Sequence, residues 1–359
     1  MRFLLLLLLC GLLVLAGHAA PPDTMLYVSL AGENRIGLYR IHADQGTLTP
    51  AGSVETGGAP GALAVDPARK FLFASVRSTQ SLASFRIAPK TGQLTPLGSV
   101  RVGVDAAYIG VDRSGKYLVS AYYGAGQVMV HAIRADGTLE GEPRSRIETA
   151  RTAHCAGLTP DNRFLFVPHT TPEAIFAFRL DAQTGRLAPL NPDRVTTPAG
   201  TGPRHLRFHP SLAVAYVANE QGSSVTAYAL GKERGTLTAL HTLPTLPAGF
   251  QGANSCAELH VHPSGRYLWV SNRGHDSLAG FAVNRETGRL TAAGHTATPK
   301  TPRSFALDPS GRFAYAAGQG STQLAAYRIQ METGALTPIH TYEVGPQPSW
   351  VEIVALPQE

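Results

Sequence analysis

The sequence is poor in cysteine and in charge. Only 3 Cys occur in 359 residues, which excludes a small scaffold stapled by disulfides. Charged residues make up 16%, too few for a coiled coil, and hydrophobic residues make up 43%, too many for a disordered chain. There is no block of five or more like charges, so the net charge of +6 predicts a basic surface and no nucleic-acid partner.

Long apolar runs are absent beyond the N-terminus. The one candidate, residues 4–15, is shorter than the roughly 20 residues that span a bilayer. It follows Arg2 and precedes the small residues AGHAA (16–20), a pattern typical of a secretory signal peptide. We therefore predict a signal peptide over residues 1–19, cleaved after Ala19, and a periplasmic or secreted chain that leaves the membrane after cleavage. A membrane anchor and a lipoprotein modified at Cys10 are the alternatives.

The chain contains seven repeats. The pattern G-x-L recurs at intervals of 45 to 53 residues, and about 20 residues later a short apolar run meets a turn, a basic residue and an aromatic. ALAVDPARKFLFASV (62–76) and ELHVHPSGRYLWVSN (258–272) are examples. The pattern of each unit predicts four short strands, and no segment has apolar residues at the regular spacing of a helix. Such units are typical of propeller blades, so the predicted fold is an all-β, seven-bladed β-propeller with four-stranded blades.

The two ends of the chain complete one blade. MLYVSL (25–30) matches the second strand of a blade, and PSWVEIVAL (348–356) matches the first. Pairing of these terminal strands closes the ring and leaves no open sheet edge. We predict a single propeller domain over residues 20–359 and a monomer. After signal cleavage Cys155 and Cys256 remain, and the sequence leaves open whether they pair.

Propeller topology predicts where a site lies. The first strand of each blade lines the central channel, and the loops before this strand and after the second strand open on one face. We call this predicted mouth the funnel. The ionisable and aromatic residues that fall there are Asp105, His154, Arg204, His205, Glu258, Arg303, Trp350, Arg77, Tyr122, Tyr123, His169, Glu220, Arg273 and His275. Arg, Glu and His gathered in one concave mouth favour an anionic small ligand and acid–base chemistry.

Motifs for other chemistries are missing or weak. There is no G-x-S-x-G elbow, no Gly-rich phosphate loop before a helix and no C-x-x-C-H haem site, so we expect no cofactor. His260 and His262 form an H-x-H whose side chains share one strand face, as metal binding would require. His262 and His209, however, occupy the turn position that Asp fills in other blades. We therefore predict turn capping and no metal site.

The segments that carry the funnel residues resemble the β-propeller lactonase family, which includes propeller-type 6-phosphogluconolactonases and the fungal carboxy-muconate cyclase. The similar segments are GPRHLRFHP (202–210), YVANE (216–220), the SNRGHDS motif (271–277) and TPRSFALDPSGRFAYAAGQ (301–319), with YYGAG (122–126) like the family's N-Y-G-G-G turn. The resemblance covers the whole mature chain and implies a lactone hydrolase of carbohydrate metabolism.

The resemblance also implies a set of site residues. The family's proposed His, Glu and two Arg fall by motif on His154, Glu220, Arg204 and Arg273, which we predict to be catalytic. We add four residues of the funnel as substrate-binding candidates: Glu258, His205, Arg303 and His275. One departure is PHTTPEA (168–174), where the family has an Asp-x-Gly-x-Asp turn. Export is another, because 6-phosphogluconolactone is a cytoplasmic metabolite.

The predicted reaction is hydrolysis of a sugar-type or other anionic lactone. Glu220 or His154 would be the general base, and Arg204 and Arg273 would bind the oxyanion or an anionic group of the substrate. Two alternatives stay open. One is a lactonizing cycloisomerase of the carboxy-muconate type that uses the same residues. The other is a non-catalytic scaffold or binding protein built from Y-V-x-N repeats.

Overall fold

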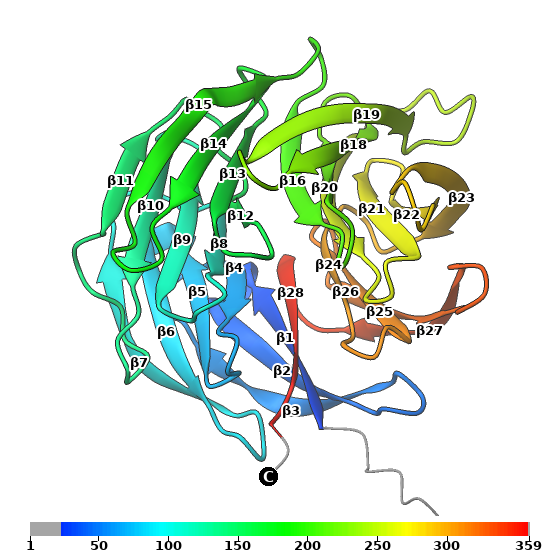
Figure 1. Ribbon diagram of the computed structural model, residues 1–359. Helices are drawn as coiled ribbons and strands as arrows, with labels where there is room; N and C mark the ends of the chain where they lie inside the picture. Colours follow the sequence, from blue (N-terminus) through cyan, green and yellow to red (C-terminus); the bar gives the residue numbers. More distant parts are fainter. Residues whose placement is uncertain (1–22, 358–359) are drawn as a thin grey trace, which may run out of the picture.

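Residues 23–357, which the computed structural model describes, form seven four-stranded antiparallel sheets arranged in a ring around a central channel (Figure 1). This confirms the predicted fold class, blade number and strand number. The innermost strands of neighbouring blades lie side by side, as β20 does between β16 and β24. The predicted signal peptide, its cleavage position and Cys10 lie outside the described residues.

The strands of each blade follow one another from the channel outward. The first three blades are β28 (Pro348–Ala355), β1 (Thr24–Leu30), β2 (Arg35–Ile41) and β3 (Leu48–Glu55); β4 (Pro60–Val65), β5 (Phe71–Val76), β6 (Ser81–Ile87) and β7 (Leu94–Arg101); and β8 (Tyr108–Val111), β9 (Tyr117–Tyr122), β10 (Gln127–Ala132) and β11 (Ser145–Glu148). Short 3-10 turns, η1 (Ala31–Glu33) and η2 (Arg77–Thr79), follow β1 and β5.

The remaining four blades have the same order. They are β12 (Gly157–Leu158), β13 (Phe164–His169), β14 (Ala174–Leu180) and β15 (Leu187–Thr196); β16 (Pro203–Phe208), β17 (Val214–Asn219), β18 (Ser224–Gly231) and β19 (Thr236–Pro244); β20 (Ser255–Val261), β21 (Tyr267–Arg273), β22 (Ser277–Val283) and β23 (Leu290–Ala297); and β24 (Pro302–Leu307), β25 (Phe313–Gly318), β26 (Gln323–Ile329) and β27 (Leu336–Glu343).

The hydrophobic core lies between the faces of adjacent blades. Every residue of β5, β13 and β17 is buried, because these second strands are covered by a neighbouring sheet on each side. Outer strands such as β7 are mostly exposed to solvent. One cluster joins Tyr216 on β17 to Leu268 on β21 in the next blade. Apolar residues therefore run continuously through second strands, which explains why their sequences do not alternate in polarity.

The G-x-L glycines are explained by contacts between blades. Gly137 has a φ of 90°, and a Cβ placed on it would lie 2.2 Å from the Phe71 ring of the preceding blade. Gly46 and Gly334 meet the rings of Phe313 and Tyr267 in the same way. The left-handed backbone and the close ring both require glycine at this turn. The repeat therefore reflects blade-to-blade packing as well as turn formation.

The ring closes as predicted. β1 pairs with β28 in antiparallel register, with Thr24 opposite Ala355 and Val28 opposite Val351. In Figure 1 the red β28 lies beside the blue β1 at the channel. This shared blade joins the ends of the described chain and leaves the ring without an unpaired inner edge.

The turns between first and second strands confirm the capping role of two histidines. Asp66 Oδ1 accepts a hydrogen bond from the backbone N–H of Phe71 over 2.6 Å. At the same position His209 Nδ1 accepts from Leu212 N over 2.9 Å, and His262 Nδ1 accepts from Ser264 N over 3.1 Å. The Nε2 of His262 lies 2.8 Å from the Gly311 carbonyl of the next blade, so the ring also ties two blades together.

Two details differ from, or extend, the sequence predictions. The inner strand of the fourth blade is reduced to the two residues of β12, so His154 precedes it in an irregular segment. Cys155 and Cys256 are both buried and free. No helix within residues 23–357 is long and apolar enough to cross a membrane.

Candidate functional site

β-Bulges at the start of the inner strands aim the predicted residues into the channel. The pairing of β16 with β17 shifts between Pro203 and His205, which leaves Arg204 as the extra residue. The same irregularity places Arg303 between Pro302 and Ser304 on β24. A bulge breaks the strict alternation of strand side chains, so the consecutive residues Arg204 and His205 both contact channel groups.

An ion-pair clamp joins two neighbouring blades on the predicted face. Glu220 follows β17, and its Oε1 accepts a hydrogen bond from Arg273 Nη2, at the end of β21, over 2.6 Å. Its Oε2 lies 3.3 Å from Arg204 Nε, at ion-pair distance but without hydrogen-bond alignment. Arg273 Nη2 also donates to the carbonyl of Cys256 over 3.1 Å. The Glu220 side chain is 23% exposed, so this clamp is reachable from solvent.

A second carboxylate lies deeper in the channel. Glu258 falls in the bulge of β20 and is 1% exposed. Its Oε1 lies 2.9 Å from His205 Nδ1 and 3.0 Å from Arg207 Nη2. The His205 ring is surrounded by the rings of His154, Tyr108 and Trp350 at centroid distances of 5.1, 5.7 and 6.0 Å. Glu258 and His205 therefore form the floor beneath the clamp.

His154 lies between the floor and the mouth of the channel. Its ring packs against His205 on one side and against Tyr123 on the other, the latter at a centroid distance of 5.5 Å. Its backbone N–H donates to the Pro168 carbonyl over 3.0 Å, which fixes the irregular segment before β12. Tyr123 belongs to the YYGAG segment and is 41% exposed. The Tyr123 ring partly covers the histidine from solvent.

Burial and positive charge keep the two histidines neutral. Burial lowers the pKa of His154 well below its ordinary value, and the charges of Arg204 and Arg303 lower it further. The pKa of His205 is lowered by the same causes, with Arg207 contributing. Burial, together with the charges of Arg273 and Arg303, lowers the pKa of Arg204. The site therefore combines neutral imidazoles with an excess of guanidinium groups, which favours an anionic ligand.

Several buried polar atoms of this cluster have no hydrogen-bond partner within residues 23–357, although Arg204 Nε lies at ion-pair distance from Glu220 Oε2, and His205 Nδ1 from Glu258 Oε1. They are Arg204 Nε and Nη1, Arg273 Nε, Glu220 Oε2, His154 Nδ1, and His205 Nδ1 and Nε2. Buried polar groups in folded proteins are nearly always hydrogen-bonded, and exceptions gather where a ligand or water binds. Unpaired donors from two arginines beside two neutral histidines therefore mark a place prepared for a polar ligand. We call Arg204, Glu220, Arg273, Arg303 and His154 the upper cluster.

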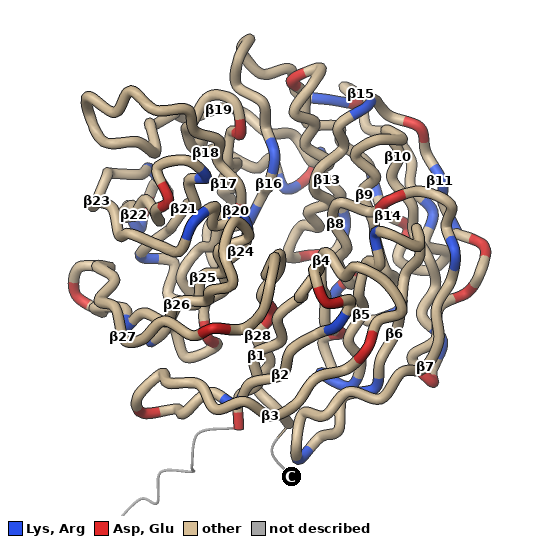
Figure 2. Tube along the Cα trace, turned by 180° about the vertical axis from the view of Figure 1, so that it is seen from behind, with Lys and Arg blue, Asp and Glu red and all other residues tan. Residues whose placement is uncertain are grey.

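A cavity of about 360 Å³ opens on the same face. Arg77, Asp105, Arg303 and Trp350 contribute to its lining. Arg77 binds Asp105 in a bidentate ion pair, with Nη2 2.5 Å from Oδ2, so its charge is largely neutralised. Arg303 connects this cavity to the upper cluster, because its charge acts on His154 and Arg204. Figure 2 shows basic residues of β16 beside the central opening.

Three predicted members of the funnel lie elsewhere. Tyr122 is fully buried in the hydrophobic core between blades. Gly274, with a φ of 129°, turns the chain after β21, and His275 Nδ1 bonds Ser277 Oγ over 2.7 Å. Its ring packs against His295 on the outer strand β23, so the structure does not bring His275 to the upper cluster. His169 is buried, with its Nε2 2.8 Å from Thr149 Oγ1 and its ring against Phe176. It links its own blade to the segment that follows β11 of the preceding blade.

The site contains contacts that the sequence pattern alone did not predict. Arg207 pairs with Glu258, and Tyr108 packs against His205. Arg207 lies two residues after His205, so strand alternation would have placed both side chains on one face. Tyr108 lies four residues before the turn residue Asp112, the same repeat position that His205 and Glu258 hold in their blades, so aligning the repeats would have placed its ring in the channel.

Comparisons with known proteins agree with the fold. A family profile described as "Lactonase, 7-bladed beta-propeller" matches residues 25–353. The 6-phosphogluconolactonase of Pectobacterium carotovorum subsp. carotovorum is 35% identical over 337 residues, covering 94% of this chain and 87% of that protein. The 6-phosphogluconolactonase of Cronobacter sakazakii is 36% identical over 289 residues, covering 80% and 72%. The solved structure of a periplasmic gluconolactonase from Pseudomonas aeruginosa is similar with a TM-score of 0.86 and 30% identity, covering 94% of this chain and 100% of that chain.

Proposed function

This chain belongs to the seven-bladed β-propeller lactonase family, and we propose that it hydrolyses a small anionic lactone of the gluconolactone type at the upper cluster. The observation that carries the proposal is the set of buried, unpaired guanidinium donors of Arg204 and Arg273 beside neutral His154. Guanidinium groups bind carboxylates, phosphates and oxyanions through paired N–H donors. A neutral imidazole accepts a proton from water.

His154 is the general base of this proposal. Glu220 is the alternative base. Its Oε1 accepts a hydrogen bond from Arg273 and its Oε2 lies beside Arg204, so this carboxylate serves to orient the two guanidinium groups. His154 has an unpaired ring nitrogen, and burial with neighbouring positive charge keeps it unprotonated at neutral pH. The imidazole therefore starts the reaction in the form that removes a proton.

The proposed reaction has two steps. His154 takes a proton from water as the water oxygen bonds to the lactone carbonyl carbon, and the carbonyl oxygen becomes an oxyanion held by Arg204 and Arg273. The tetrahedral intermediate then collapses and the ring C–O bond breaks. The imidazolium of His154 returns the proton to the leaving alkoxide. The product is an open-chain hydroxycarboxylic acid, which releases its carboxyl proton to solvent at neutral pH, and the imidazole is again neutral.

The natural substrate class follows from charge and location. Arg303 adds a third guanidinium at the mouth, which suits a substrate with an anionic substituent. The predicted signal peptide and the periplasmic P. aeruginosa relative support export of this chain. An exported enzyme meets unphosphorylated sugar lactones and other carboxylated lactones more readily than cytoplasmic sugar phosphates. N-terminal sequencing of the chain recovered from the periplasm tests export, and an uncleaved N-terminus would contradict it.

The test of the proposed function is hydrolysis of a lactone panel by the purified mature chain. The panel holds gluconolactone, 6-phosphogluconolactone and a carboxylated lactone, and base uptake is followed at constant pH against spontaneous hydrolysis. We expect enzyme-dependent ring opening of at least one member. Product analysis by NMR separates hydrolysis from lactonization, since a cycloisomerase would consume an unsaturated acid instead. Absence of turnover on the whole panel would overturn the proposal.

A further inference from the structure

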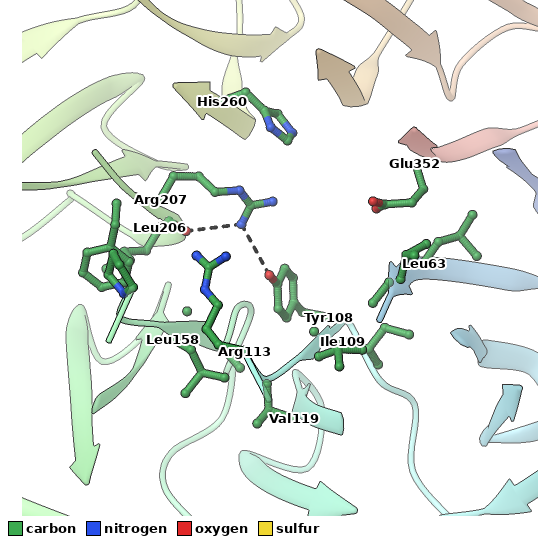
Figure 3. A pocket seen from close by; sticks show the side chains of 18 of the residues that line it. Leu63, Tyr108, Ile109, Arg113, Val119, Leu158, Leu206, Arg207, His260 and Glu352 are labelled. Carbon is green, nitrogen blue, oxygen red and sulfur yellow. Dashed lines mark hydrogen bonds between the residues drawn. The ribbon is translucent and has the colours of Figure 1, made fainter. Parts of the chain in front are cut away.

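The larger cavity of the propeller lies at the opposite end of the channel from the upper cluster. It has a volume of about 670 Å³, within the range of small-molecule sites. Its walls come from the later residues of β4, β8, β12 and β16 and from the turns at Pro160 and Pro210, with His260 of β20 and Glu352 of β28 across from them (Figure 3). We call this space the lower cavity.

One wall of the lower cavity carries two guanidinium groups. Arg207 projects into it and donates from Nη2 to Glu258 Oε1 over 3.0 Å, while its Nη1 lies 3.4 Å from the Tyr108 hydroxyl. Arg113 points into the same space in Figure 3. Within residues 23–357 no carboxylate pairs with the Arg113 guanidinium; the only hydrogen bond of this residue is from its backbone N–H to Asn162. The wall therefore carries an uncompensated positive charge.

The facing wall supplies polar groups with little negative charge. Burial raises the pKa of Glu352 to about 7, and a hydrogen bond from Trp350 and the charge of Arg207 only partly oppose this effect. Burial lowers the pKa of His260 to about 4, so this ring is neutral. Near neutral pH this wall therefore offers a carboxyl group that is partly protonated and an imidazole. Both form hydrogen bonds with a hydroxyl group.

Between these walls the surface is apolar. Val65, Val111, Leu158 and Phe208 are partly buried and line the space. A short carbon skeleton fits such a surface better than a fully hydrated inorganic anion does, because apolar contact is gained only by a carbon-containing ligand.

We propose that the lower cavity is a second ligand site that binds a small hydroxycarboxylate, with its carboxylate between Arg113 and Arg207 and its hydroxyl at the wall of Glu352 and His260. This binding does not depend on the proposed hydrolysis, although ring opening of a lactone releases a compound of the same chemical class. Glu258 contacts both Arg207 and His205, so the site is adjacent to the floor of the upper cluster.

The test is isothermal titration of the purified mature chain with 4-hydroxybutyrate, butyrate and inorganic phosphate. The titrations use the Arg273→Ala variant, in which binding at the upper cluster is weakened. We expect 4-hydroxybutyrate to bind at least about 5-fold more tightly than butyrate, as one hydrogen bond predicts, and more tightly than phosphate. Equal affinity for butyrate or for phosphate, or absence of binding, would overturn the proposal.

Arg113→Ala in the Arg273→Ala background locates the binding. Arg113 is exposed at a turn, so the variant keeps the blade core intact, and its urea midpoint verifies this. We expect the affinity for 4-hydroxybutyrate to fall about 10-fold or more. Lys116→Ala is the matched control, since it removes the same charge from the same turn but does not line the cavity. Equal effects of the two substitutions would contradict the assigned site. If the lactone panel shows no turnover while 4-hydroxybutyrate binds as expected, the proposed function is contradicted and the second ligand site is not.

Discussion

Arg273 and Glu220 belong to neighbouring blades, and the Nη2 of the arginine lies 2.6 Å from the Oε1 of the glutamate. The same nitrogen donates to the Cys256 carbonyl, so two acceptors hold this nitrogen and orient the guanidinium. Its Nε remains unpaired and buried. The clamp therefore presents a donor to the channel without requiring any movement when a substrate binds, which is the arrangement that stabilises developing charge.

Substitution Arg273→Lys tests whether this fork is required. A lysine ammonium carries the charge but cannot reproduce the planar set of donors that binds Glu220, Cys256 and a ligand together. We expect kcat/KM to fall by roughly 10- to 100-fold, the effect of one or two charge-assisted hydrogen bonds. Arg285→Lys, on an exposed turn after β22 of the same blade, is the control. Comparable activities of the two variants would show that charge alone suffices.

Glu258→Gln tests the buried floor. The glutamine keeps the shape but removes the negative charge that lies 3.0 Å from Arg207 and 2.9 Å from His205. Removing one partner of a buried pair leaves the other charge uncompensated, and part of this cost is relieved because Arg207 is partly exposed. We expect the free energy of unfolding in urea to fall by about 1–3 kcal/mol. Glu286→Gln, an exposed residue, should have no such effect. An unchanged urea midpoint for Glu258→Gln would refute the pairing.

Stability should fall steeply in mild acid. Burial lowers the pKa of His131, His169 and His260 to about 4, and it lowers the pKa of His154 and His205 as well. Between pH 6.5 and 4 these histidines are protonated in the unfolded chain but not in the folded chain. Their contribution to the free energy of unfolding is therefore complete above pH 6.5 and is lost as the pH falls toward 4. Each histidine contributes a slope of up to about 1.4 kcal/mol per pH unit in this window. The pKa of Glu352 is raised to about 7, so this group alone makes the folded chain more stable as the pH falls. Its effect is smaller than the combined effect of the five histidines.

Urea unfolding at pH 7, 6 and 5 measures this slope. His131→Phe serves as the diagnostic variant, because His131 is fully buried in β10, away from the channel, and both of its ring nitrogens lack partners. We expect the free energy of unfolding of the variant to change less steeply with pH than that of the parent, by up to about 1.4 kcal/mol per pH unit. A free energy of unfolding that stays constant from pH 7 to pH 5 would contradict the interpretation.

Much of the architecture was predictable from the sequence. Gly137 and its six equivalents recur because each must turn the chain and admit a neighbouring side chain, so the repeat directly encodes the ring. The strand match between 25–30 and 348–356 encodes the closure. The same topology placed Glu220 and Arg273 at one mouth, because the ends of second strands in adjacent blades lie side by side.

Other features could not be predicted, for physical reasons. The bulges at Arg204 and Arg303 each follow a proline at the first position of the strand, but a proline there does not by itself specify an extra residue, so strand alternation alone misassigns the direction of these side chains. His275 follows a second strand, and the topology therefore predicted it in the funnel. Its side chain turns outward because the hydrogen bond to Ser277 and the φ of Gly274 set its direction. The lower cavity depends on packing among several blades, and no single segment encodes it.

The measurement that tests the central claim most directly is kcat for lactone hydrolysis by His154→Gln, compared with His131→Gln. Both substitutions replace a buried histidine that has an unpaired ring nitrogen, but only His154 belongs to the upper cluster. Loss of a general base predicts a fall in kcat of about 10²–10⁴-fold for His154→Gln, with His131→Gln close to the parent. Full activity of His154→Gln, or equal losses in the two variants, would contradict the assignment of His154 as the base that activates water.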